Sequence, residues 1–448
     1  MTTTLLAAEA SSTELVSLFW VVLVVFAAPV LSSLTRSLVP GVVLLLVGGM
    51  LVGPNGFGLA VESGGVAMLA ELGLGMLFLL AGFELEVSSV TGRGGRRAAG
   101  TWLVSMILAA GVGWLVSGRW ETSVAIGLLL TSTAVGTLLP ILKGAGHDGT
   151  PVGRAVLTHG AVGELGPVLV MAVLLGTRSV GSSLVAVGLF FAAALVTLVV
   201  PAHLLRIPGL GRALVRGTTT TSQLAMRTVL LLLAAMMVVA TVFGLDVVLG
   251  AFAAGIILRR LVDVLADQLR PGDEVPGRGL AEVLTHQLET VGYSVFIPVF
   301  FVVSGMAISV NAVAAAPGIL VAAVASMLVI RGGGVWVSET LVRNSPGLTT
   351  TRERARVGLY AATGLPIIVA VTGVAVDNGL LGAEISSVLV AAGAVTVLVF
   401  PMLAELVRTL DDRPDRSRRR ASGPEGPPIG SVRRGDELPD ATDTTTTK

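Results

Sequence analysis

Residues 125–142 read AIGLLLTSTAVGTLLPIL, an apolar run that is interrupted near its centre. The interruption consists of three consecutive hydroxyl residues, Thr131, Ser132 and Thr133. Gly136 and Pro140 follow them. Proline removes a backbone donor and glycine tolerates an unwound conformation, so the pattern predicts a helix that is broken within the membrane. Backbone of this kind is tolerated at membrane depth only inside protein or along a cavity.

A second run, GLYAATGLPIIVAVTGV at residues 358–374, repeats the pattern with Thr363, Gly364 and Pro366. Two interrupted helices at corresponding places in two halves of a chain are typical of a transporter whose substrate site lies where inverted repeats meet. Two proline-kinked packing helices are the alternative interpretation.

Composition places these runs in a membrane protein. The chain has 448 residues, of which 53% are hydrophobic and 13% are charged, whereas soluble domains average about 25% charged residues. A bilayer core requires about 20 apolar residues per helix, and about thirteen such runs can be delimited. They lie near residues 14–34, 39–57, 64–85, 98–117, 121–142, 152–176, 181–204, 224–243, 245–260, 284–307, 313–340, 354–375 and 382–408. The sequence therefore predicts an all-α polytopic membrane protein with inverted repeats and two discontinuous crossing helices.

The distribution of basic residues predicts the orientation of this bundle. Alternate loops carry nearly all the basic residues, whereas the other set carries only Arg119 and Arg178. The positive-inside rule then places the N-terminus outside and the C-terminus in the cytoplasm. Residues 1–410 are predicted to form the membrane domain. Residues 411–448 are too polar and proline-rich to bury a core, so they are predicted to be a disordered cytoplasmic tail.

Two ionisable residues interrupt apolar runs. Glu164 lies inside LTHGAVGELGPVLVMAVLL at residues 157–175, and Arg331 lies inside the eleventh run. An ionised group near the bilayer centre is costly, so both side chains are expected to face protein or water. The partner of Glu164 is a proton, a cation or Arg331. A carboxylate that exchanges among these is the minimal machinery of a proton-coupled cation carrier, whereas a permanent salt bridge with Arg331 is the structural alternative.

The remaining polar residues of the runs have less specific interpretations. His159 precedes Glu164 by five residues and is either a satisfied core histidine or a relay and gating group. Glu71 and Glu339 lie near predicted span edges and are interpreted as helix-end or packing residues, and Asp246 as an interfacial residue.

Other function classes are disfavoured. The chain has no cysteine and only four scattered histidines, which excludes disulfides and thiolate sites and argues against a zinc cluster. It shows no nucleophile, base and orienting group at usable spacing and no nucleic-acid footprint. We therefore expect neither an enzyme nor a cofactor.

Six stretches in order along the chain resemble the monovalent cation:proton antiporter superfamily, with its sodium/proton exchanger fold, and in particular its bacterial second branch. They are PGVVLLLVGGMLVGPNGFGL (40–59), AELGLGMLFLLAGFELE (70–86), TSTAVGTLLPILKGAG (131–146), AVGELGPVLV (161–170), FGLDVVLGAFAAGIIL (243–258) and FIPVFFVVSGMAIS (296–309). The resemblance spans roughly residues 15–408 and implies a multi-pass protein of the bacterial plasma membrane.

The resemblance also implies a homodimer in which each protomer has a dimerisation part and a mobile core that moves as an elevator. The core holds two crossing broken helices beside an acidic residue. Site residues carried over from the family are Thr131, Ser132, Thr133, Glu164, Arg331, Thr363 and Gly364. The family generally has Asp at the position of Glu164, preceded by Asp, Asn or Gln, whereas this chain has Gly163 there. One carboxylate instead of two favours electroneutral exchange.

The predicted function is secondary antiport, in which Glu164 binds either H+ or a metal cation, Na+ or K+. Hydroxyls and freed carbonyls near residues 131–133 and 363–364 would complete the cation's oxygen shell. One alternative is an organic-anion or bile-acid-like carrier in which Arg331 binds the substrate's carboxylate. Another is a sensory or channel-like membrane protein that has lost exchange.

Overall fold

The computed structural model describes residues 2–34, 39–85, 92–144, 146–147, 149–174, 180–205, 224–266, 277–341 and 347–411. Residues 1–408 belong to one compact unit. Of the predicted tail, only Asp411 is among the described residues, as the last residue of the final helix.

The regular secondary structure of the described residues is helical throughout. Most of it is α-helix, with two short π-helical segments, η1 and η2, in line with longer helices. The elements are α1 (Thr2–Leu34), α2 (Gly41–Val52), α3 (Gly64–Glu84), α5 (Arg93–Ser117), α6 (Trp120–Thr131), α7 (Val135–Gly144), α8 (Pro151–Leu174), α9 (Val180–Leu205), α11 (Leu224–Val242), α12 (Val247–Ala266), α13 (Gly277–Val291), η1 (Gly292–Phe296), α14 (Ile297–Met306), α15 (Val310–Ala315), α16 (Pro317–Ser326), η2 (Met327–Gly332), α17 (Gly333–Leu341), α18 (Thr351–Ala361), α19 (Pro366–Asp377) and α20 (Ala383–Asp411).

The predicted all-helical membrane fold is confirmed. Within the described ranges, 11 helical segments are long and apolar enough to cross a membrane. The two other predicted runs correspond to α2, which has only 12 residues, and to α12, which carries Arg259, Arg260 and Asp263. The total of thirteen spans therefore stays a prediction.

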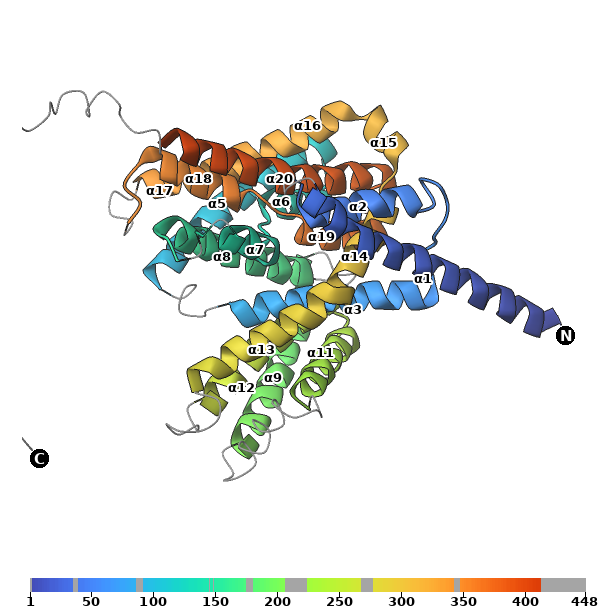
Figure 1. Cartoon of the computed structure of the whole chain (residues 1–448). Coiled ribbons are helices and arrows are strands. Elements are labelled where there is room, and N and C mark those ends of the chain that lie inside the picture. Colours follow the sequence, from blue (N-terminus) through green and yellow to red (C-terminus); the bar gives the residue numbers. More distant parts are fainter. Residues whose placement is uncertain are drawn as a thin grey trace, which may run out of the picture. The chain divides into compact units, whose positions relative to one another are not determined.

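Contacts between helices concentrate in two groups (Figure 1). The first, which we call the core group, consists of α5, α6, α7, α8, η2, α17, α18 and α19. The second, the panel group, consists of α1, α2, α3, α9, α11, α12, α13, η1 and α14. The main contacts between the groups are those of α3 with α7 and of α8 with α9 and α12. Both broken helices lie in the core group.

Glycine allows α3 and α12 of the panel group to pack closely. A Cβ atom at Gly82 of α3 would lie 2.2 Å from the carbonyl oxygen of Phe252 in α12. A Cβ atom at Gly255 of α12 would lie 2.1 Å from the carbonyl oxygen of Leu79 in α3. Small residues in membrane helices permit such close backbone contact, which replaces the hydrophobic driving force that lipid does not supply.

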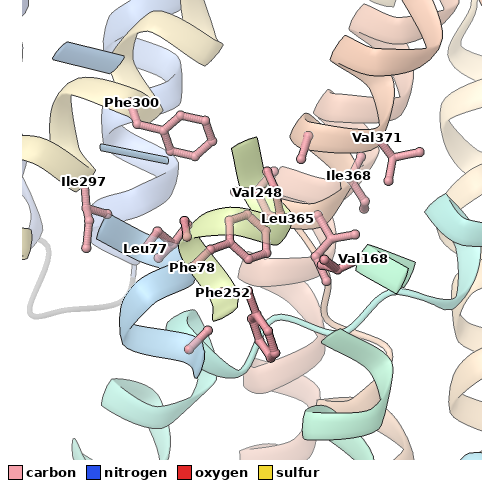
Figure 2. Packing of buried hydrophobic residues seen from close by; sticks show 14 of the residues in the cluster. Leu77, Phe78, Val168, Val248, Phe252, Ile297, Phe300, Leu365, Ile368 and Val371 are labelled. Carbon is pink, nitrogen blue, oxygen red and sulfur yellow. The ribbon is translucent and has the colours of Figure 1, made fainter. Parts of the chain in front are cut away.

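Apolar side chains from both groups belong to one buried cluster. Leu77 and Phe78 of α3 and Phe252 of α12 contribute from the panel group, and Val168 of α8 and Ile368 of α19 from the core group (Figure 2). Leu365, in the second helix break, belongs to the same cluster. The cluster joins the two groups through van der Waals contact, which has no directional requirement.

Candidate ion site

The first predicted break is confirmed. Helix α6 ends at Thr131 and α7 begins at Val135, so residues 132–134 are not helical. Thr131 is thus the last helical residue rather than part of the unwound stretch. Gly136 and Pro140 lie within α7, beyond the break. The three adjacent hydroxyl residues explain the position of the break, because Ser and Thr side chains compete with the helical backbone for hydrogen bonds.

The second predicted break is confirmed as well. Helix α18 ends at Ala361 and α19 begins at Pro366, which leaves Thr363 and Gly364 between them. Proline suits the first turn of a helix because the amide at that position has no intrahelical acceptor. A Cβ atom at Gly364 would lie 2.5 Å from the carbonyl oxygen of Ser132 in the first break. Glycine is therefore required where the two breaks meet.

Hydrogen bonds join the two breaks directly. The amide of Ala134 donates to the carbonyl oxygen of Thr363 at 2.9 Å. The hydroxyl of Thr133 donates to the carbonyl oxygen of Ala361 at 2.5 Å. Backbone groups released by one break are thus satisfied by the other, as required where water is scarce.

A proline in α8 ties that helix to the first break. Pro167 lies inside α8 and has no N–H, so the carbonyl of Gly163, four residues earlier, lacks its helical donor. The amide of Thr133 donates to this carbonyl at 3.0 Å. The bond fixes the break beside the segment of α8 that carries Glu164.

Glu164 is 4% exposed. The amide of Val135, the first residue of α7, donates to its carboxyl group. The N-terminus of a helix favours negative charge. No Lys, Arg or His of the described ranges forms a salt bridge with Glu164. The ionisable side chains that interact electrostatically with it include another carboxylate, Glu84 at the end of α3.

Arg331 is fully buried in η2 and turns toward the first break rather than toward Glu164. Its Nε and Nη2 each donate to the Thr133 hydroxyl oxygen at 3.2 Å. Nη2 also donates to the carbonyl oxygen of His159 at 2.7 Å. The salt bridge with Glu164 considered from the sequence is not formed in this conformation, and Arg331 instead holds the break against α8.

The departure at position 163 has a steric cause. A Cβ atom at Gly163 would lie 2.5 Å from Nη2 of Arg331 and 2.6 Å from the hydroxyl oxygen of Thr133. The Arg331 guanidinium thus occupies the space that a side chain at position 163 would need. A side chain at position 163 would therefore require Arg331 or Thr133 to move.

The four hydroxyl side chains of the two breaks are all buried, but they are engaged differently. Thr131 and Ser132 donate to carbonyls one turn back in α6, at 2.7 and 3.1 Å, and Thr363 donates one turn back in α18 at 3.4 Å. A hydroxyl that donates its hydrogen keeps its oxygen lone pairs for a cation. Thr133 differs, because its oxygen accepts from the cationic Arg331.

His159 contacts a second buried carboxylate. Its Nε2 lies 2.9 Å from Oε1 of Glu339, and Nη2 of Arg97 lies 2.5 Å from the same oxygen. Glu339 is 0% exposed and lies close to the end of α17, in agreement with its interpretation as a helix-end or packing residue. Its sequence separation of 242 residues from Arg97 explains why no local pattern indicated the pair.

Two further residues near Glu164 escaped the sequence interpretation. Glu84 closes the apolar stretch of α3, and Tyr293 lies in η1 of the panel group. The Tyr293 hydroxyl donates to the carbonyl oxygen of Gly136 in α7 at 2.8 Å. Pro140 has no N–H for that carbonyl, so tyrosine supplies the donor from the other helix group. The proline four residues after Gly136 was the available sequence signal.

A membrane bundle whose two broken helices cross beside a buried carboxylate has the construction of a secondary ion transporter. The family described as "Sodium/hydrogen exchanger, transmembrane" matches residues 21–406. The chain therefore belongs to the sodium/hydrogen exchanger family. Membership supports proton-coupled cation exchange, with H+ and Na+ as the transported ions, by a multi-pass membrane protein.

Individual relatives agree with this assignment. The chain is 24% identical over 409 residues to the probable Na(+)/H(+) antiporter 3 of Methanocaldococcus jannaschii, covering 86% of this chain and 95% of that protein. It is 24% identical over 315 residues to the putative Na(+)/H(+) antiporter YjbQ of Bacillus subtilis, covering 66% of this chain but only 48% of that protein. These names describe transporters, in line with the expectation that the protein is not an enzyme.

The fold matches that of a solved structure. The sodium proton antiporter MjNhaP1 of Methanocaldococcus jannaschii superposes with a TM-score of 0.59, covering 89% of this chain and 98% of that one, at 15% sequence identity. At this identity the likeness concerns the fold alone.

Proposed function

We propose that the protein is an electroneutral antiporter that exchanges one proton for one Na+ or K+, with Glu164 as the shared site. The observation that carries this proposal is the environment of Glu164. Its carboxyl is buried beside the crossing of two broken helices and has a backbone amide, but no basic side chain of the described residues, as its partner.

Competition for a single carboxylate accounts for antiport. A desolvated carboxylate requires compensation of its charge, and either a proton or a metal cation supplies it. The two ligands exclude one another, so the release of one accompanies the binding of the other. Because Glu164 is neutralised by one positive charge in both states, the exchange carries no net charge.

The breaks provide oxygen ligands for the cation. Thr131 and Ser132 retain hydroxyl lone pairs, and the second break contributes Thr363 and Gly364 at the crossing. Na+ and K+ are bound by oxygen ligands. Arg331 is assigned a positioning role, because its hydrogen bonds hold Thr133 and the backbone of α8.

The division into two helix groups supports an elevator movement. The core group carries both breaks and Glu164, and the two groups share a large apolar cluster. The polar contacts between them include the Tyr293–Gly136 hydrogen bond and the Lys143–Glu289 ion pair, which such a movement would have to break. Sliding of the core group along the panel group would expose Glu164 alternately to the two sides. A homodimer, an outside N-terminus and a cytoplasmic C-terminus complete the proposal.

The experiment that tests this function measures cation-induced proton movement in proteoliposomes. Na+ and K+ are added separately at acidic, neutral and alkaline pH to vesicles that contain the wild type, Glu164→Gln or Glu71→Gln. Glu71 is exposed on α3 and serves as a carboxylate control. We expect a saturable pH change with the wild type and with Glu71→Gln, but none with Glu164→Gln. Exchange in well-folded Glu164→Gln would assign the proton to another group.

The shared site also predicts how affinity depends on pH. Protons compete with the cation for Glu164, so the apparent KM for the cation is expected to fall as pH rises. At pH values where the site is mostly protonated, the change is about tenfold per pH unit, since one proton is released per cation bound. An apparent KM that does not depend on pH would show that the two ions have separate sites.

The anion-carrier alternative has less support. Arg331 already donates to Thr133 and to the backbone of α8, which leaves Nη1 as its atom without a partner in the described structure. Transport that depends on an organic anion would favour this alternative. The absence of any flux would favour the non-transporting sensory protein.

A further inference from the structure

Glu84 is a second carboxylate at the Glu164 site that comes from a distant part of the chain. It is the last residue of α3, and its Oε2 atom is buried without a hydrogen-bond partner. A buried polar oxygen without a donor is uncommon and requires an explanation. A proton or a cation would satisfy it.

The position of Glu84 relates it to Glu164 across the boundary between the helix groups. Helix α3 belongs to the panel group and contacts α7, whose first amide binds Glu164. The two carboxylates interact electrostatically, and Tyr293 interacts with both. Position 163 holds no carboxylate, but two carboxylates from different helix groups interact electrostatically here.

An ion pair that is partly exposed to solvent is among the charged groups that act on Glu84. Nζ of Lys143 lies 3.3 Å from Oε1 of Glu289, and their side chains are 47% and 32% exposed. Glu84 interacts electrostatically with both residues. From the exterior inward, the charged groups are therefore the Lys143–Glu289 pair, Glu84 and Glu164.

We propose that Glu84 is the cytoplasmic loading residue of the exchanger. It attracts the monovalent cation past the Lys143–Glu289 pair toward Glu164 and supplies one oxygen ligand during entry. This inference rests on the proposed function. Lys143 forms its ion pair with Glu289, and no salt bridge among the described residues includes Glu84, so the charge of Glu84 is open to the transported cation. Closely spaced charges of one sign at a site shielded from bulk water raise the local concentration of counter-ions.

The location of Glu84 restricts its effect to cation entry from one side of the membrane. Glu84 belongs to the panel group and Glu164 to the core group, so an elevator movement separates them. Glu84 then serves Glu164 only in the orientation in which α3 and α7 lie together. By the proposed orientation this is the cytoplasmic side, where Lys143 also lies.

The test compares cation affinity from the two sides of the membrane. Na+-driven or K+-driven proton movement is measured in everted and right-side-out membrane vesicles with the wild type, Glu84→Gln, Glu84→Asp and the α3 control Glu71→Gln. For Glu84→Gln we expect the apparent KM to rise about tenfold in everted vesicles, the lower end of such charge effects. Right-side-out vesicles and Glu71→Gln should show the wild-type KM, and Glu84→Asp should recover part of the affinity.

A substitution of a partly exposed residue tests the loading role through a change of KM in the opposite direction. Lys143→Gln removes the positive charge that faces Glu84 and leaves Glu289 in place, so the KM from the cytoplasmic side should fall. This variant stays informative where Glu84→Gln reduces folding, which size-exclusion chromatography of solubilised protein reveals.

The failures of the two proposals are distinguishable. Wild-type protein without exchange overturns the proposed function together with this inference. Exchange that requires Glu164, with a KM that neither Glu84→Gln nor Lys143→Gln changes, overturns the loading role alone. A rise in KM of equal size from both sides also overturns it, because Glu84 would then act in both orientations.

Discussion

The surroundings of Glu164 and Glu339 differ although both carboxylates are almost completely buried in the core group. Glu339 of α17 contacts the guanidinium of Arg97 and the imidazole of His159. Glu164 of α8 accepts from the backbone amide of Val135 and interacts with another carboxylate across the boundary between the groups. Burial alone therefore does not define the exchange site. Under the proposed function, the carboxylate without a basic partner among the described residues exchanges its ligand, whereas the paired one stabilises the core group.

The largest effect on stability is expected from Glu339→Gln. The substitution leaves the Arg97 guanidinium, which is 27% exposed, without its carboxylate partner. Removal of one member of a fully buried ion pair costs about 3–5 kcal/mol, so we expect a loss toward the lower end of this range. Thermal unfolding of the solubilised protein should show a large loss of stability. The double variant Arg97→Gln, Glu339→Gln should recover most of it.

The matched variant for this comparison is Glu164→Gln, which should lose exchange but keep wild-type thermal stability. If Glu164→Gln unfolds the protein and Glu339→Gln does not, the assignment of an exchange role to Glu164 and a stabilising role to Glu339 would be wrong.

A smaller effect is expected from Gly163→Ala. The added methyl group meets Arg331 Nη2 and the Thr133 hydroxyl, both of which are buried. Overpacking of a dense interior costs about 1–3 kcal/mol. Exchange should fall because the first break is displaced next to Glu164. Gly166→Ala is not a suitable control, because its Cβ atom would clash with Trp102, whereas Gly94→Ala meets nothing closer than 3.9 Å and should be neutral.

Wild-type exchange and stability in Gly163→Ala would mean that Arg331 has room to move. In that case the steric explanation of the glycine before Glu164 would not hold.

The smallest effect is expected from Tyr293→Phe, which removes the donor to the Gly136 carbonyl. A neutral hydrogen bond contributes about 1 kcal/mol, so the loss of stability should be of that order. Pro140→Ala restores a helical N–H for the same carbonyl. In that background, Tyr293→Phe should therefore have almost no effect.

This double-mutant cycle, measured by thermal unfolding, isolates the energy of the Tyr293–Gly136 hydrogen bond between the two helix groups. Equal effects of Tyr293→Phe in both backgrounds would show that the tyrosine stabilises the structure through another contact.

Local chemistry made much of the site predictable. The hydroxyl residues 131–133 and the Thr363–Pro366 segment indicated both breaks, because they disturb helical hydrogen bonding regardless of what surrounds them. Glu164 was predictable as well, since a carboxylate in an apolar run requires a function or a partner. The boundary of the first break was shifted by one residue at Thr131, because helix ends depend on which carbonyls find donors.

The hydrogen-bond and ion-pair partners of the buried charged residues were not predictable in the same way. Arg331 had Glu164 as an obvious candidate, but it binds Thr133 and the carbonyl of His159 instead. Glu339 was correctly placed near a helix end, but its partners Arg97 and His159 lie in other helices and could not be inferred from the local sequence. The roles of Pro167 and Pro140 also became clear only when the donors that replace their missing amides were known.

The sequence by itself determined an all-helical membrane protein with two broken helices and one carboxylate at membrane depth. Hydrophobicity, hydroxyl groups and proline act on neighbouring residues, so their consequences can be derived from the chain alone. Only the tertiary structure decided which backbone groups join the two breaks, that Glu339 is paired with Arg97 and His159, and that Glu84 interacts electrostatically with Glu164. These depend on which helices pack together, and packing brings together side chains and carbonyls that are far apart along the chain.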